Sequence, residues 1–434
     1  MGTDCATGTC ANLFCGYPPI LLLDAGGNES CVKLANNNLK CWGNNGNGEL
    51  GLGDKASRGD AANEMGNSLP VVALGTGRSA KLVSVGGLFT CALLDDNTTK
   101  CWGANAVGQL GQGDTSARGD NGGEMGDALL AVNLGTGRTA KVVSAGGAFA
   151  CAILDDNTTK CWGGNLSGQL GLGDAIARGD GPNEMGASLP VVALGTGRTA
   201  KALSSGGVHT CAILDDNTVK CWGANDSGQL GLGDVNNRGD AASEMGPSLP
   251  IVLLGTGRTA KAIAAGASHT CAILDNDTVK CWGGNDTGQL GLGDINNRGD
   301  AAGEMGDALP IVALGTGRTA KAITAGVGHT CARLDNDTVK CWGANGNGQL
   351  GLGDVNNRGD AAGEMGDALP VVALGPGRTV LFVSSGFRHT CAGLDDNTLK
   401  CWGFNTTGQL GLGDKLARGD GPNEMGANLP TVAF

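Results

Sequence analysis

Long apolar runs are missing from this 434-residue sequence, and no stretch is long enough to cross a bilayer. The longest apolar run near the start, residues 20–23, is too short for the core of a signal peptide. Lys and Arg form no cluster, and the formal net charge is −12. Because an acidic surface repels phosphate groups, we expect neither DNA nor RNA as a partner.

Aromatic residues are also scarce, at 3 %, whereas glycine contributes 80 residues. Glycine without a three-residue period excludes collagen and indicates many tight turns. No Ser/His/Asp or Cys/His constellation stands apart from the repeated pattern described below. We therefore expect a protein that is not an enzyme, with no small-molecule substrate and no cofactor other than the calcium weighed below.

Cysteine is abundant, and fourteen of the 17 cysteines form seven pairs with a spacing of ten residues. Zinc sites would need short Cys-x-x-Cys motifs or nearby histidines, and neither is present. We interpret the pairs as disulfides formed in an oxidising compartment. They are Cys31 and Cys41, Cys91 and Cys101, Cys151 and Cys161, Cys211 and Cys221, Cys271 and Cys281, Cys331 and Cys341, and Cys391 and Cys401.

The pairs belong to a repeat of sixty residues, which the seven tryptophans, from Trp42 to Trp402, follow without insertion or deletion. Units of constant length suit a closed ring. One unit reads as four strands: 198–205, 210–214, 218–222 and 249–254. If 215–217 form a three-residue hairpin loop, Cys211 lies opposite Cys221, within reach of a disulfide, and Asn217 takes the left-handed position.

The segments 206–214, 219–225 and 228–234 resemble the repeats of the regulator-of-chromosome-condensation family. The chain is most similar to its secreted, cysteine-paired members, often labelled alpha-tubulin suppressor-like. The resemblance covers residues 19–434 and implies an all-β, seven-bladed β-propeller with one four-stranded blade per repeat. Residues 1–18 would form a cysteine-containing segment outside the ring.

Family members range from nucleotide-exchange factors of small GTPases to protein inhibitors, so the fold does not fix the function. This chain lacks the basic tail of the chromatin-binding members and any inserted segment for a GTPase, which disfavours an exchange regulator. We expect a non-enzymatic scaffold or interaction propeller, extracellular or at the cell surface, that binds a protein or assembles with itself. An inhibitor-like protein-binding module is the alternative.

The long loop of each unit carries carboxylates among glycines, and Asp234, Asp240 and Glu244 are candidate calcium ligands. Arg238 within this group opposes a cation, which favours a structural role for the carboxylates. The loop's Arg-Gly-Asp tripeptide occurs at the same position of every unit, as expected of a loop-folding element. The loop also contains candidate glycosylation sequons that share one position, at Asn165, Asn225, Asn285 and Asn405.

A loop that varies while its scaffold repeats is a candidate binding rim. Its residues are Leu88, Phe89, Phe149, Val208, Phe387 and Arg388. Phe89 and Phe149 share their register with four histidines (His209, His269, His329 and His389), for which we expect a packed, hydrogen-bonded role beside the ring channel. Outside the repeat, three further cysteines cannot all pair among themselves and are candidates for an intermolecular bond: Cys5, Cys10 and Cys15.

Overall fold

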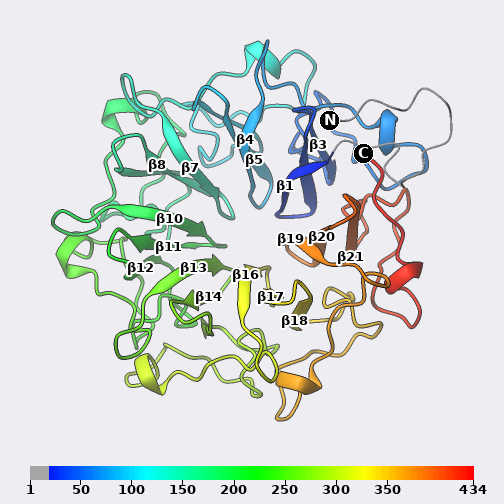
Figure 1. The fold of residues 1–434 in the computed structure, drawn as a ribbon. Helices are drawn as coiled ribbons and strands as arrows, with labels where there is room; N and C mark the ends of the chain where they lie inside the picture. Colours follow the sequence, from blue (N-terminus) through cyan, green and yellow to red (C-terminus); the bar gives the residue numbers. More distant parts are fainter. Residues whose placement is uncertain (1–18) are drawn as a thin grey trace, which may run out of the picture.

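Each sixty-residue repeat folds into one antiparallel sheet of three strands, in a computed structural model that describes residues 19–434. The seven sheets stand radially around a common axis (Figure 1). We call them blades 1 to 7; blade 1 holds β1 (Ile20–Ala25), β2 (Glu29–Leu34) and β3 (Leu39–Gly43). The predicted β-propeller is therefore confirmed, and no helix among the described residues has the length and apolarity to span a membrane.

The remaining blades repeat this order. Blades 2 to 4 hold β4 (Ala80–Val85), β5 (Phe89–Leu94), β6 (Thr99–Gly103), β7 (Ala140–Ala145), β8 (Phe149–Leu154), β9 (Thr159–Gly163), β10 (Ala200–Ser205), β11 (His209–Leu214) and β12 (Val219–Gly223). Blades 5 to 7 hold β13 (Ala260–Ala265), β14 (His269–Leu274), β15 (Val279–Gly283), β16 (Ala320–Ala325), β17 (His329–Leu334), β18 (Val339–Gly343), β19 (Val380–Ser385), β20 (His389–Leu394) and β21 (Leu399–Gly403). Single 3₁₀ turns follow the long loops: η1 (Gly66–Ser68), η2 (Gly126–Ala128), η3 (Gly186–Ser188), η4 (Gly246–Ser248), η5 (Gly306–Ala308), η6 (Gly366–Ala368) and η7 (Gly426–Asn428).

The disulfides lie in the hairpins between the second and third strands, as predicted. Cys211 pairs with Cys221 across β11 and β12, with their Cα atoms 4.1 Å apart. The hairpin closes through a hydrogen bond from the Leu214 amide to the Thr218 carbonyl, and Asn217 has a φ of 69°. All seven pairs form bonds in this register. The spacing of ten thus follows from the turn and the register.

The predicted fourth strand is absent from the hydrogen-bonded sheets. Residues 249–254 run beside β12, but a single backbone hydrogen bond joins them. The amide of Val252 donates it to the carbonyl of Val219. Leu249 and Leu254 are nevertheless buried. The segment is therefore held to the blade by apolar packing, and Pro250 removes one donor that a ladder would need.

Tryptophans join neighbouring blades. Trp102 of blade 2 is fully buried, and its indole N–H donates to the carbonyl of Glu49 in blade 1 at 3.0 Å. Trp42 makes the same bond to Gln409 of blade 7, which closes the ring. The backbone amide of Gly66 also donates to Ala433 near the end of the chain. Figure 1 shows β1 and this C-terminal segment side by side, which confirms the expected closure.

Candidate functional site

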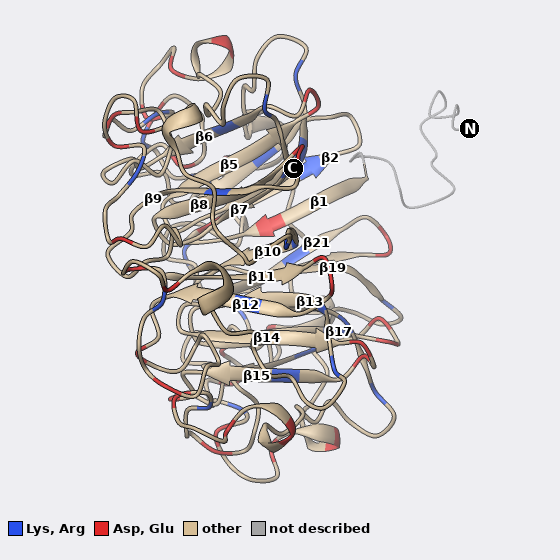
Figure 2. Ribbon diagram, turned by 90° about the vertical axis from the view of Figure 1, so that its left-hand side faces the viewer, with Lys and Arg blue, Asp and Glu red and all other residues tan. Residues whose placement is uncertain are grey.

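The two faces of the ring carry different loops, because the first and third strands of each blade run parallel to each other. The connection from the first to the second strand and the long loop after the third strand emerge on one face, here called the loop face. The hairpin turns emerge on the other. Figure 2 shows the acidic residues mainly in these loops and turns, whereas basic residues also lie on the strands, among them β2 and β15.

Seven short connections surround the mouth of the central channel on the loop face. We call these mouth loops: residues 26–28, 86–88, 146–148, 206–208, 266–268, 326–328 and 386–388. Backbone hydrogen bonds join them in a belt, for example from Gly27 to Gly86 and from Gly87 to Gly146. A Cβ atom on Gly87 would lie 2.3 Å from the carbonyl oxygen of Gly147, so the close approach of these two loops requires glycine at position 87.

The last residue of each mouth loop varies and points to solvent in several blades. Leu88 and Val208 are 43 % and 41 % exposed, and the adjacent pair Phe387 and Arg388 is exposed as well. The predicted rim is wrong in two members, because Phe89 and Phe149 are fully buried. They begin the second strands β5 and β8, where the side chain turns inward.

A further exposed residue belongs to this rim and was missed in the sequence. Leu166, in the long loop of blade 3, is 88 % exposed. Its loop starts beside the mouth loop of the same blade, since the amide of Gly164 donates to the carbonyl of Ala148. The signal was present, because the same position holds Gly, Ala, Asp or Thr in the six other repeats. We call Leu88, Ala148, Leu166 and Val208 the apolar arc of blades 2 to 4.

The channel mouth contains a cavity of about 310 Å³, lined by the ends of the inner strands and by the mouth loops. Asp24 is the one ionisable residue in its lining. The equivalent position holds a hydroxyl in five other blades: Ser84, Ser144, Ser204, Thr324 and Ser384. Each hydroxyl oxygen accepts a backbone N–H from the next blade at 2.9–3.0 Å.

Asp24 makes the same inter-blade contact and one more. Its Oδ2 accepts the amide of Val85 at 2.8 Å, and its Oδ1 accepts the Ser384 hydroxyl at 3.1 Å. Burial nevertheless raises the pKa of Asp24 to about 6, against the lowering effect of these hydrogen bonds. The carboxylate is thus incompletely stabilised by the groups that surround it.

Two more buried carboxyl groups lie in blade 1, where other blades have neutral residues. Glu29 occupies the register of the buried histidines. Glu49 occupies the register at which the six other repeats have glutamine, for example Gln109. Both side chains are fully buried, and burial raises the pKa of each. Oε1 of Glu29 has no hydrogen-bond partner among the described residues. Blade 1 therefore concentrates buried acid groups next to the channel.

The four histidines are packed and hydrogen-bonded between blades, as expected. Nε2 of His209 lies 2.9 Å from Oγ1 of Thr270, whose hydroxyl donates to the carbonyl of Gln229. The histidine must then donate through Nε2–H, which leaves Nδ1 as a bare acceptor without a partner among the described residues. Burial lowers the pKa of His209 and His329 to about 3 and that of His269 and His389 to about 4.

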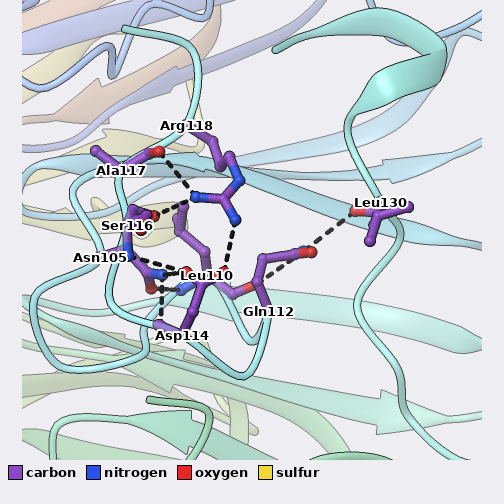
Figure 3. Close-up of polar contacts among 8 residues, drawn as sticks. All are labelled: Asn105, Leu110, Gln112, Asp114, Ser116, Ala117, Arg118 and Leu130. Carbon is purple, nitrogen blue, oxygen red and sulfur yellow. Dashed lines mark hydrogen bonds and ion pairs between the residues drawn. The ribbon is translucent and has the colours of Figure 1, made fainter. Parts of the chain in front are cut away.

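Two of the three calcium candidates, Asp234 and Glu244, have separate structural roles. Asp234 accepts a hydrogen bond from Arg238 at 2.6 Å, and Glu244 accepts the backbone amides of Gly239 and Ala241. The described residues contain no cluster of three metal-binding side chains, so the calcium prediction gains no support from the geometry. Figure 3 shows the equivalent loop of blade 2, where Arg118 bonds Asp114 and two backbone carbonyls and thereby folds the Arg-Gly-Asp loop.

The structure contradicts the glycosylation predicted for the shared loop register. Asn165 is 1 % exposed; its Nδ2 donates to Asp174, and its Oδ1 accepts the Leu170 amide. Asn225, Asn285 and Asn405 are equally buried and bonded. Asn105 of blade 2, which is not in a sequon, holds its loop in the same way (Figure 3). The asparagine is thus a loop-folding residue, and a glycan on its nitrogen would prevent this fold. Cys5, Cys10 and Cys15, with segment 1–18, lie outside the described residues.

Comparison with known sequences gives one family and several relatives. The RCC1-like domain matches residues 23–430. The ultraviolet-B receptor UVR8 of Arabidopsis thaliana is 28 % identical over 410 residues, which cover 92 % of this chain and 81 % of UVR8. Protein pim1 of Schizosaccharomyces pombe is 28 % identical over 345 residues, 76 % of this chain and 60 % of pim1. The human E3 ubiquitin-protein ligase HERC2 is 26 % identical over 375 residues, which are 86 % of this chain but 7 % of HERC2.

Solved structures agree on the fold. Yeast RCC1 (Prp20) bound to Kap60 has a TM-score of 0.64 at 19 % identity, with 99 % of this chain and 90 % of that chain covered. Prp20p of Saccharomyces cerevisiae, described together with its binding properties to Gsp1p and histones, has a TM-score of 0.63 at 19 % identity and covers 93 % of this chain and 86 % of its own. At this identity the likeness supports the propeller architecture alone.

Proposed function

Because the chain belongs to the RCC1-like domain family, we propose that it is a non-enzymatic interaction propeller which binds a protein partner through the loop face. The observation that carries this proposal is the contrast between a repeated scaffold and a variable, partly apolar channel mouth. Leu88, Leu166 and Val208 expose aliphatic side chains there, and Phe387 and Arg388 are exposed in the mouth loop of blade 7. Exposed apolar residues grouped on a rigid scaffold are typical of protein-binding surfaces.

The proposed setting is extracellular or at the cell surface. Seven disulfides, all buried, support an oxidising compartment during folding. Prp20, whose partners include Kap60, Gsp1p and histones, is a precedent for protein binding by this fold. The acidic net charge of −12 disfavours nucleic acids as partners and favours a protein with basic groups.

Partner capture by matched variants tests the proposal. The variant L88S/L166D/V208S places on the apolar arc the residues that other blades carry there, namely Ser268 and Asp226. The control L381K changes an exposed leucine on β19 to lysine, the residue that five other inner strands carry at this register, for example Lys81. We expect the control to retain a secreted protein partner captured from culture medium and the triple variant to lose it. Equal capture by both variants would contradict binding through the loop face.

The partner's identity separates the functional alternatives. An inhibitor-like module would block the active site of a captured enzyme, which an activity assay of that enzyme measures. A scaffold would capture structural proteins or further copies of this chain. A small GTPase whose nucleotide release accelerates would support the exchange regulator instead.

A further inference from the structure

The cavity at the channel mouth is polar around its circumference except at one blade. Six blades contribute a side-chain oxygen at the register of Asp24, whereas blade 5 contributes Ala264, next to Ile263. Blade 5 also lacks the inter-blade hydroxyl of this register, because Ala264 replaces serine. At about 310 Å³ the cavity has the size of a small-ligand site, with a polar circumference that includes Asp24 and an apolar sector at blade 5.

The carboxylate of Asp24 has capacity for another donor. Each of its oxygens accepts one hydrogen bond, from the Val85 amide and from the Ser384 hydroxyl, so about half of its lone pairs are unused. The other residues that line the cavity carry no charge. Glu29, which interacts electrostatically with Asp24, is also acidic, and the exposed Arg388 lies one residue beyond the lining residue Phe387. A cation would therefore meet attraction and no repulsion from a fixed positive charge within the lining.

We propose that the channel mouth binds a protonated primary amine on an aliphatic chain, with Asp24 as its counter-ion and Ile263 and Ala264 as the apolar wall. The amine is either a lysine side chain of the protein partner or a free alkylamine. The lysine source rests on the proposed function and deepens it, whereas the alkylamine source does not need a partner. The raised pKa of Asp24 agrees with this site, since a bound cation stabilises the ionised form.

The ring supplies matched variants for the test. D24S introduces the residue that four other blades carry at this register, where serine also accepts the next blade's amide. D24S/S144D moves the carboxylate to blade 3. There Ser84 of the preceding blade corresponds to Ser384, and the amide of Ser205 in the following blade corresponds to that of Val85. Folding of each variant is checked by thermal unfolding without reductant.

Calorimetric titration of the full chain with butylammonium chloride, at constant ionic strength and with tetramethylammonium chloride as control, tests the site directly. We expect butylammonium to bind the wild type, D24S to weaken its affinity about tenfold to a hundredfold, and D24S/S144D to restore it. No binding to the wild type, equal binding by D24S, or no restoration in a folded D24S/S144D protein would overturn the proposal.

A second arm distinguishes the two sources of the amine. A short lysine peptide is compared with the same peptide acetylated on its lysine. Binding that acetylation abolishes assigns a lysine side chain to the site, whereas binding of butylammonium alone assigns a free alkylamine. This arm uses no protein partner, so its outcome is independent of the capture experiment on the apolar arc.

Discussion

The buried histidines make the ring sensitive to acid, and replacing them by phenylalanine should remove that sensitivity. The folded pKa values are about 3 for His209 and His329 and about 4 for His269 and His389, against an ordinary value of 6.5. As the pH falls below 6.5, the unfolded chain therefore binds protons that the folded ring does not. Stability is unaffected above pH 7 and is lost progressively between pH 6.5 and the folded pKa values.

The magnitude follows from the shifts. At pH 5 each histidine is 1.5 pH units below the unfolded pKa and still neutral in the ring, which costs about 2 kcal/mol. Four independent histidines would cost about 8 kcal/mol. The raised pKa values of Asp24, Glu29 and Glu49 act in the opposite direction, because their protonated forms are favoured in the ring. They are present in both proteins and cancel in a comparison.

The chain itself shows that phenylalanine fits this position. Phe149 is buried at the register of His209, and Thr210 beside it keeps its hydrogen bond to the Gln169 carbonyl. We therefore choose H209F/H269F/H329F/H389F and measure urea unfolding at pH 7.5 and pH 5 with the disulfides intact. The wild type should lose about 8 kcal/mol more than the variant between the two pH values. The single variant H329F should account for about 2 kcal/mol of this. An equal loss in wild type and variant would refute the inference that these histidines stay neutral in the fold.

Three further predictions concern the disulfides, Asp24 and the head of the chain. C211S/C221S should lower the free energy of unfolding by somewhat under about 3 kcal/mol, the chain-entropy value for a loop of this length, as measured by denaturant unfolding; native free thiols at these cysteines would contradict the pairing. D24S should stabilise the ring at pH 7.5 by about 3 kcal/mol, because the raised folded pKa of about 6 penalises ionisation, and the gain should vanish near pH 3.5; a constant gain at both pH values would point to packing instead. Non-reducing electrophoresis should show a reducible dimer or ladder that is lost when Cys5, Cys10 and Cys15 become serine, whereas a clean monomer would exclude the intermolecular bond.

The sequence predicted the parts of this molecule that follow from local rules. The ten-residue cysteine spacing and Asn217 were sufficient for the hairpin register, because the turn length and the strand pairing leave one arrangement. The fourth strand was wrong because an apolar run such as residues 249–254 has the same pattern whether it is held by backbone bonds or by packing. The sequon at Asn165 misled for a related reason, since a loop asparagine that bonds its own backbone looks like an accessible one.

The site needed the structure because its residues come together only through the ring. Asp24 and Ser384 are 360 residues apart in the sequence and in contact at the closing junction. Within its own repeat Asp24 is one more acidic residue in an acidic chain, and nothing local shows that it faces a channel. Comparison of the seven repeats at this position singles Asp24 out, because every other repeat has serine, threonine or alanine there. In a ring of near-identical units, symmetry makes a common residue structural by default, and a residue that breaks the symmetry and lines a cavity is the better candidate for recognition. Asp24 meets both conditions, and the apolar arc of blades 2 to 4 lies on the mouth loops and long loop of the neighbouring blades, so this side of the loop face is where partner binding should be sought first.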